Sequence, residues 1–221
     1  DSIDKINENP DLRTEIIEDE KDIANDKGQT RFPLSITQKG FFILNKLNPE
    51  SSPNLVALIP VRGKIDKESF QKALNFLVER HPMLRTRFVK KGLNTIQEII
   101  SFHEVKIEFT DLAQNRDGEK EIRKMFEGYK KIQFDLAELP LYRLSSFSIS
   151  PTSSVLLFCI HHIIGDAWSM KVLTDELLEV YDQIKSGSSA SLPKLNTSFL
   201  NLIEEESQKT NLAPFQITKT N

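Results

Sequence analysis

The residues best suited to chemistry lie together in the stretch HHIIGDAW, which begins at His161. The apolar run before it, residues 155–160, has the character of a β-strand, and open α/β sheets expose ligand-binding groups at the carboxyl ends of their strands. Neighbouring strand side chains point to opposite faces, so if one of His161 and His162 faces a cleft, the other faces the interior. A neutral imidazole can accept a proton from an attacking hydroxyl or amine. Asp166 could orient a loop or neutralise a cation.

Other interpretations of these residues stay open. Two adjacent histidines can be purely structural. A metal site would need a further ligand beside His161, His162 and Asp166, and adjacent strand histidines diverge, so no metal is expected. Cys159 could share a face with His161 as a Cys–His nucleophile, although a cysteine inside an apolar strand is usually an inert core residue. Trp168 fits either the core or the wall of a cleft.

The composition is that of an ordinary globular protein. The chain has 221 residues, 38% of them hydrophobic and 28% charged, which suits one large domain or two small ones. Its longest apolar stretch is too short to cross a bilayer, and no charged-then-apolar leader opens it, so no membrane association is expected. The single cysteine excludes an internal disulfide and fits a cytoplasmic protein.

The net charge of −3 hides an uneven distribution along the chain. Residues 1–30 hold ten acids and four bases, a charge of −6, which leaves 22 acids and 25 bases, a charge of +3, in the remainder. That remainder is too weakly basic to suggest a nucleic-acid partner. The acidic residues 1–30 are predicted to be a linker, or a docking segment with a short helix that uses Leu12, Ile16 and Ile17.

The helices and strands that must position the histidines are predicted from residue 35 onward. Residues 35–47 are predicted to form a helix and residues 55–61 a strand. Asp66 caps the next helix, which Pro82 stops. Three strands are then predicted over residues 84–89, 95–100 and 105–109.

The remaining predicted elements lie on both sides of the histidine pair in the sequence. A helix is predicted over residues 118–132, a hairpin pairs residues 141–149 with 155–160, and a last helix covers residues 169–184. A hairpin among interspersed helices indicates a mixed β-sheet covered by helices, an α/β fold of the α+β two-layer sandwich type.

Four blocks, in the same order, resemble the condensation domains of nonribosomal peptide synthetases. HHIIGDAWSM is similar to their HHxxxDG motif and the Trp-Ser pair that commonly follows it, and RHPMLRTRF, from Arg80, looks like their block RHxxLRTxF. SITQKGFFIL, from Ser35, is similar to the opening block, and FDLAELPLYR, from Phe134, resembles the segment before the hairpin. The resemblance covers residues 32–184, with a looser match beyond.

The resemblance implies a fold and a place in a larger protein. Condensation domains have two lobes, each like chloramphenicol acetyltransferase, with a tunnel between them, and are about twice this length. Residues 31–185 are therefore expected to form the N-terminal lobe. Residues 186–221 would be a linker and a helix leading toward a C-terminal lobe that this chain lacks.

The resemblance also assigns roles to the motif residues. His162 matches the histidine that faces the tunnel and either removes a proton from the attacking amine or holds that amine in place. His161 would support the site from the lobe's interior. Asp166 matches an aspartate that pairs with an arginine, for which Arg85 is the expected partner. The cleft and motif neighbours are Gly165, Ala167, Trp168 and Ser169, and Ala167 replaces the motif glycine, which could narrow the acceptor side.

The implied reaction is amide-bond formation in secondary metabolite and antibiotic biosynthesis. An acyl or aminoacyl thioester on one carrier protein's phosphopantetheine would be joined to the amine of an amino acid on the next. The chain itself would bind no cofactor. The expected partners are the upstream and downstream peptidyl carrier proteins, the C-terminal lobe and an adjacent adenylation domain, and the lobe alone is expected to be inactive.

Two alternatives from other classes remain. One is a stand-alone coenzyme A-dependent O- or N-acyltransferase that acts as a trimer, although in chloramphenicol acetyltransferase the histidine lies near the C-terminus, whereas about 60 residues follow His162 here. The other is a non-catalytic module that docks carrier proteins.

Overall fold

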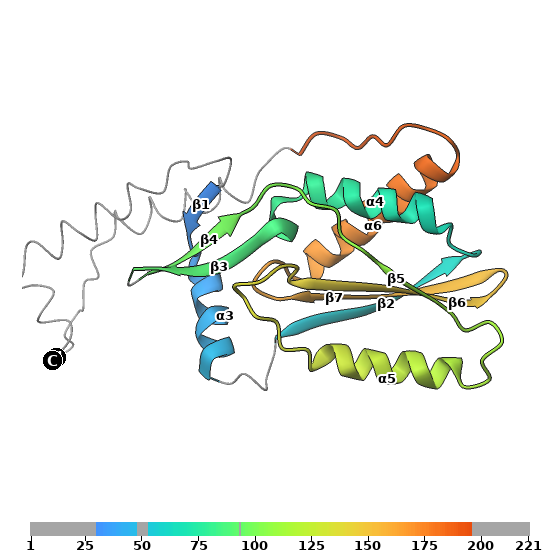
Figure 1. Cartoon of the computed structure of the whole chain (residues 1–221), viewed down its shortest axis with the longest axis horizontal. Coiled ribbons are helices and arrows are strands. Elements are labelled where there is room, and N and C mark those ends of the chain that lie inside the picture. The colour runs from blue at the N-terminus through green and yellow to red at the C-terminus, as the bar shows by residue number, and fades with distance from the viewer. Residues whose placement is uncertain (1–29, 48–52, 93, 196–221) are drawn as a thin grey trace, which may run out of the picture.

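The structure, a computed structural model, describes residues 30–47, 53–92 and 94–195 (Figure 1). Helices and strands follow one another along the chain in the order β1 (Thr30–Pro33), α3 (Ile36–Leu47), β2 (Asn54–Arg62), α4 (Lys67–Arg80), the 3-10 helix η1 (Pro82–Arg85), β3 (Thr86–Lys91), β4 (Asn94–Ile99), β5 (Glu108–Asp111), α5 (Gly118–Lys130), β6 (Tyr142–Ser150), β7 (Ser153–His161) and α6 (Ala167–Lys185).

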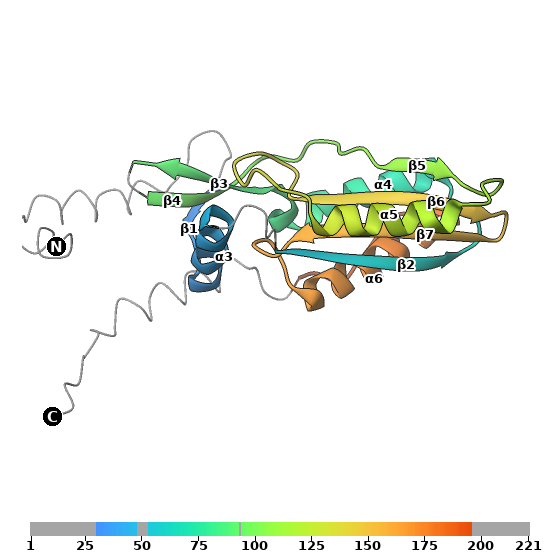
Figure 2. The same ribbon diagram turned by 90° about the horizontal axis from the view of Figure 1, so that it is seen from below.

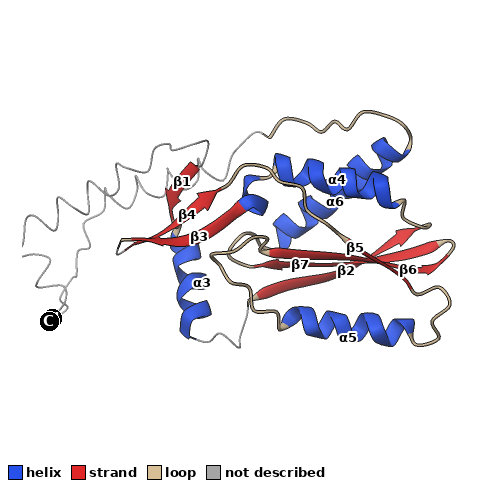
Figure 3. Cartoon of the chain, in the orientation of Figure 1, coloured by secondary structure: helices blue, strands red, loops and turns tan. Residues whose placement is uncertain are grey.

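The larger sheet contains four strands in the order β2-β7-β6-β5 (Figure 3). β2 and β6 lie antiparallel to β7, whereas β5 lies parallel to β6, so the sheet is mixed, as expected. β6 and β7 form the predicted hairpin. β7 lies between two strands, and most of its side chains are buried, which explains why its sequence is a continuous apolar run rather than an alternating one.

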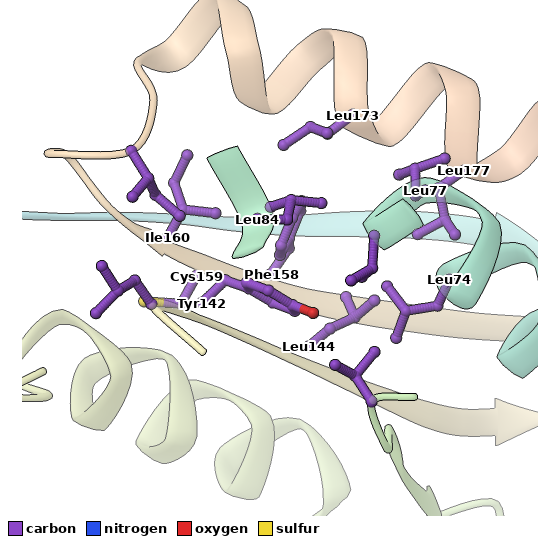
Figure 4. Close-up of a cluster of buried hydrophobic side chains, with 14 of the residues drawn as sticks. Leu74, Leu77, Leu84, Tyr142, Leu144, Phe158, Cys159, Ile160, Leu173 and Leu177 are labelled. Atoms are coloured by element: carbon purple, nitrogen blue, oxygen red, sulfur yellow. The ribbon is translucent and has the colours of Figure 1, made fainter. Parts of the chain in front are cut away.

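Helices cover both faces of this sheet. α4 and α6 lie side by side over one face, and α5 lies over the other (Figure 2). The expected fold class is confirmed, with α5 adding a helical layer on the second face. Leucine, isoleucine and aromatic side chains fill the space between the sheet and the helices α4 and α6, among them Leu74, Leu77, Leu144, Phe158, Ile160, Leu173 and Leu177 (Figure 4). Each such side chain contributes about 1.5–3 kcal/mol through burial.

The ends of α4 follow from local sequence. The Oδ1 atom of Asp66 accepts a hydrogen bond from the Ser69 backbone amide at 2.8 Å, which satisfies one of the free amides of the first turn. Pro82 restricts His81 to an extended conformation and ends the helix before it. The same proline starts η1, where its fixed φ is favourable.

A second, smaller sheet has the order β1-β4-β3, and α3 lies beside it at the end of the larger sheet where β7 finishes (Figure 1). The carboxylate of Glu98, a buried residue of β4, accepts two hydrogen bonds from arginines of the neighbouring strands. Nε of Arg31, in β1, donates at 2.7 Å, and Nε of Arg87, in β3, donates at 2.8 Å. Burial alone would raise the pKa of Glu98, but the hydrogen bonds from the two arginines outweigh it and hold the pKa below its usual value. One carboxylate thus ties three strands together.

In the smaller sheet and the connection after it, the structure differs from the predicted elements at three places. β1 was not predicted, because four residues containing a proline carry no recognisable period. The predicted strand over residues 84–89 begins with η1, and the strand itself starts at Thr86. The predicted strand over residues 105–109 starts only at Glu108, since the buried Val105 and Ile107 belong to a connection that packs on the core.

Some expectations concern residues outside those described. Residues 1–29 and 196–221, which hold the acidic segment and most of the expected C-terminal linker and helix, lie there. α6 ends at Lys185, and residues 186–195 form neither helix nor strand. No helix within the described ranges is long and apolar enough to span a membrane.

Candidate active site at the end of strand β7

His161 is the last residue of β7 and lies fully inside the lobe. Its Nδ1 atom accepts a hydrogen bond from the backbone N–H of Ile163 at 3.1 Å, and its ring forms a T-shaped pair with Phe134. Because Nδ1 accepts, the proton of the neutral ring is on Nε2, which has no hydrogen-bond partner among the described residues. Burial and, less strongly, the neighbouring His162 lower the pKa of His161 to about 4. His161 is therefore neutral at physiological pH.

His162, the next residue, is partly exposed. Its ring stacks on the ring of Phe41, in α3, with centroids 4.5 Å apart and planes inclined by 22°. Within the described part of the chain, no side chain makes a hydrogen bond to its ring nitrogens. Its backbone N–H donates to the carbonyl of Pro53 at 2.8 Å, just before β2. The backbone is thus fixed, while the stacked imidazole has both ring nitrogens uncommitted among the described residues.

The backbone immediately after the two histidines forms a tight turn. The amide of Ile164 donates to the carbonyl of His161 at 3.1 Å, and the amide of Ile163 is taken by the His161 ring. His161 therefore shapes the turn that carries its neighbour. The two adjacent histidines therefore differ in their surroundings, since His161 is buried and His162 is partly exposed.

Asp166 caps α6. Its Oδ1 atom accepts the Ser169 amide at 2.8 Å and the Ser169 hydroxyl at 2.7 Å. The two hydrogen bonds from Ser169 hold the pKa of this carboxyl below its usual value, with a small contribution from His162. The helix consequently begins at Ala167, two residues earlier than predicted.

The predicted ion pair between Arg85 and Asp166 is wrong. The guanidinium of Arg85 donates to backbone carbonyls only: Nε to Val78 at 2.9 Å, Nη2 to Glu79 at 3.3 Å, and Nη1 to Ile100. It thus satisfies carbonyls of the last turn of α4, as basic side chains commonly do at helix C-termini. Asp166 is exposed and needs no buried cation, because the start of α6 supplies its donors.

The other motif neighbours lie around the start of α6. Gly165 is confined, because a Cβ atom there would lie 3.0 Å from Cβ of Ser169 and 3.2 Å from Cδ1 of Ile160. Ala167 is exposed at the first helical position. Trp168 is 71% exposed, so the core interpretation of this residue is wrong and its ring is part of the surface.

Two alternative chemistries can be judged from the same strand. The Cys159 side chain is fully buried and directed at the carbonyl of Tyr129 at 3.7 Å, and burial raises the pKa of its thiol to about 12. A protonated, inaccessible thiol is not a nucleophile. In the described ranges no group of three or more His, Cys, Asp or Glu residues is arranged to hold a metal ion.

Sequence reasoning missed two contributors to this site, Gln38 and Gln97. Gln38, in α3, is 3% exposed and donates from Nε2 to Oε1 of Gln97 at 3.1 Å and to the carbonyl of Ile163 at 3.4 Å. Gln97, in β4, is fully buried and donates to the carbonyl of Pro33 at 2.7 Å. The only local signal was the Ser-x-x-Gln spacing of a capping box at Ser35, which reveals the helix start but not the distant partner.

The fold and site define a mixed α/β lobe with a histidine pair at the end of its central strand. The sequence model described as "Condensation domain" matches residues 28–219. The chain belongs to the condensation-domain family.

Curated relatives are large synthetases. The chain is 34% identical over 166 residues to a linear gramicidin synthase of Brevibacillus parabrevis, a match covering 74% of this chain and 3% of that protein. It is 33% identical over 155 residues to surfactin synthase subunit 1 of Bacillus subtilis (strain 168), covering 70% of this chain and 4% of that protein. The chain thus spans only a small part of these relatives.

Solved structures share the fold. The starter condensation domain of rhizomide synthetase RzmA matches with a TM-score of 0.74 at 20% identity, covering 82% of this chain and 46% of that one. The first condensation domain of the calcium-dependent antibiotic synthetase, in complex with a substrate analogue, matches with a TM-score of 0.74 at 18% identity, covering 82% and 44%. The lobe corresponds to somewhat less than half of each solved chain.

Proposed function

We propose that this chain acts as the N-terminal lobe of a condensation domain that forms an amide bond between two carrier-protein-bound substrates, with His162 as the catalytic residue. One observation carries the proposal. The ring of His162 is partly exposed at the end of the central strand with both nitrogens uncommitted among the described residues, while the adjacent His161 is buried and neutral. A neutral imidazole in this position can accept a proton or a hydrogen bond from an amine.

The proposed reaction is a transfer between two tethered groups. The amine nitrogen of the acceptor attacks the thioester carbonyl of the donor, a C–N bond forms, and the C–S bond breaks. The departing phosphopantetheine thiolate takes up a proton, and the amine loses one, which His162 accepts or directs. Because a thioester is already activated, positioning the two reactants supplies most of the acceleration, and acid–base help is modest.

The partners and location follow from the family and belong to the proposal. The donor and the acceptor arrive on the phosphopantetheine arms of upstream and downstream peptidyl carrier proteins, and an adenylation domain loads the acceptor. A C-terminal lobe closes the other side of the tunnel. The relatives, gramicidin and surfactin synthases, support a multidomain synthetase. We place the protein in the cytoplasm, where carrier proteins are loaded.

The proposal is tested by condensation between two loaded carrier proteins, followed by intact-protein mass spectrometry. The chain is assayed alone, with a separately expressed C-terminal lobe, and with His162→Ala in each case. We expect little product from the chain alone, because the proposed lobe forms only one side of the substrate channel. Product should appear with the added lobe and disappear in His162→Ala.

The outcomes separate the three classes of function. Restored activity that depends on His162 supports a condensation lobe. Carrier-protein binding with no product in any lane, while a complete condensation domain works, would favour a docking module. Acyl transfer from coenzyme A by a trimer, shown by light scattering and a thiol-release assay, would favour the stand-alone acyltransferase and overturn the proposal.

A further inference from the structure

Helix α3 buries a polar side chain, Gln38, where most helices bury an apolar one. Gln38 is the one buried residue among Ile36–Leu47, all of which the structure describes. Most helices bury an apolar stripe, and a buried polar side chain is the more informative observation. The outer residues Ile36, Ile43, Leu44 and Leu47 are exposed. Phe41 and Phe42 pack partly buried against the core, so α3 is held by these two rings and by the hydrogen bonds of one buried amide group.

One half of the Gln38 carboxamide completes a capping box. Its Oε1 atom accepts the amide of Ser35 at 2.9 Å, and Oγ of Ser35 accepts the amide of Gln38 at 3.1 Å. A glutamate would serve equally well for this purpose, because only an acceptor is needed. The capping box alone does not explain why the residue is a glutamine.

The other half of the carboxamide requires a glutamine. Nε2 donates to Oε1 of Gln97 and to the carbonyl of Ile163, two acceptors that a carboxylate could not satisfy. Gln97 is itself held, because its Nε2 donates to the carbonyl of Pro33. The two amides form a buried network from the start of α3 to the turn after the histidines.

The same helix also touches the imidazole itself. Phe41 comes three residues after Gln38, so both side chains project from one face of α3. Phe41 stacks on the His162 ring, while Gln38 reaches the carbonyl of Ile163, the next residue of the turn. The helix therefore contacts the ring of His162 and the backbone directly after it.

We propose that Gln38 is a positioning residue for His162, acting through the Ile163 carbonyl and the placement of Phe41, an inference that rests on the function proposed for His162. Loss of the Nε2 donors frees the turn and lets the imidazole leave the Phe41 face. The reaction then slows because a small misplacement of a catalytic group costs far more in rate than in binding.

The test uses ¹³C,¹⁵N-histidine-labelled chain in solution, together with condensation kinetics in the presence of the C-terminal lobe. The first variant, Gln38→Met, keeps the length of the side chain and removes its donors. The second, Gln38→Glu, keeps the capping acceptor, so the helix start is preserved even if Gln38→Met fails to fold. Ser35→Ala is the matched control, because it weakens the cap and leaves the Nε2 donors in place.

Three readouts are expected. The ring-to-ring nuclear Overhauser contact between Phe41 and His162 is lost in both Gln38 variants and kept in Ser35→Ala, while the signals of exposed His103 stay unchanged in all. The kcat falls about tenfold in both Gln38 variants with KM for either carrier protein within about twofold. In Ser35→Ala, kcat stays within about twofold of the parent.

The two proposals fail separately. If the parent chain with its added lobe makes no product, the proposed function fails, and the Phe41–His162 contact still tests the role of Gln38. A folded Gln38→Glu variant that keeps this contact would overturn the positioning role. So would an equal loss of the contact in Ser35→Ala, since Gln38 would then act only as part of the helix cap.

Discussion

The Nε2 atom of His81 lies 2.6 Å from Oε2 of Glu176, which joins the end of α4 to the middle of α6. The same carboxylate accepts Nε of Arg80 at 3.1 Å and Nη2 at 3.2 Å. The three side chains are only 14–17% exposed, so solvent and salt screen the Arg80–Glu176 ion pair less than they would at the surface. This cluster links the C-terminal end of α4 to α6.

Replacing Glu176 tests that cluster. Glu176→Gln keeps the size of the side chain and removes its charge, and we expect the free energy of unfolding to fall by about 1–3 kcal/mol, because hydrogen bonds to a charged group are weakened. Urea unfolding followed by circular dichroism measures the change. Glu179→Gln, an exposed position on the same helix, is the control and should change little. Equal effects at both positions would argue against the cluster.

A double-mutant cycle checks the separate roles of Arg85 and Asp166. Arg85→Met should lose about 2 kcal/mol, because three backbone carbonyls lose their donor. Asp166→Ala should lose about 1 kcal/mol, as expected for a missing helix N-cap. The two losses should add to within about 0.5 kcal/mol in the double variant, since the side chains share no contact. A coupling energy above about 1 kcal/mol would instead indicate that Arg85 and Asp166 interact directly.

The buried His161 makes stability depend on pH. Its pKa is about 4 in the folded lobe, lowered by burial and then by His162, whereas an unfolded histidine has a pKa of about 6.5. Between these values the unfolded chain binds more protons, so the lobe loses stability as the pH falls. His161 should account for about 2 kcal/mol of loss between pH 7 and pH 5.

His161→Asn isolates this effect. The asparagine oxygen can replace Nδ1 as the acceptor for the Ile163 amide, and it does not titrate. Denaturant unfolding of both proteins at pH 7 and pH 5 gives the comparison, and the other three histidines are present in each. The variant should show a markedly flatter pH dependence. Identical slopes would mean that the pKa of His161 is the same in the folded lobe as in the unfolded chain, and would overturn the lowered value.

Two small substitutions near the start of α6 should differ in how much stability they cost. Gly165→Ala places a methyl group against Ser169 and Ile160, and we expect a loss of about 1–3 kcal/mol together with a displaced Asp166–Ser169 cap. Ala167→Gly restores the motif glycine at an exposed helical position and should cost about 1 kcal/mol or less. Thermal unfolding distinguishes them. A Gly165→Ala variant as stable as the parent would show that the turn has room to move.

Local signals predicted the parts of this fold whose causes are local. Asp66, the helical spacing after it and Pro82 bounded α4 closely, and the apolar run before His161 predicted the buried strand β7. The same apolar run also predicted that the histidine pair lies at the end of a strand. These features can be predicted because the residues that cause them lie within a few positions of one another in the sequence.

The side-chain partners that the sequence did not reveal are distant from one another along the chain. Gln38 lies 125 residues from Ile163, and His81 lies 95 residues from Glu176. No spacing rule connects such residues before the sheet order is known. The pairing expected for Arg85 failed for a different reason, because the nearby carbonyls at the end of α4 are better placed to accept its donors than Asp166.

The wide separation of the contacts around the histidine turn also orders the folding of the lobe. β6 and β7 are neighbours in sequence, and their hairpin closes a very short loop. The turn after His162 is complete only when Pro53 and Gln38 have arrived from the first quarter of the chain. Contacts that close long loops cost more entropy and form later. During refolding, the signals of His162 should therefore reach their native positions after those of the hairpin.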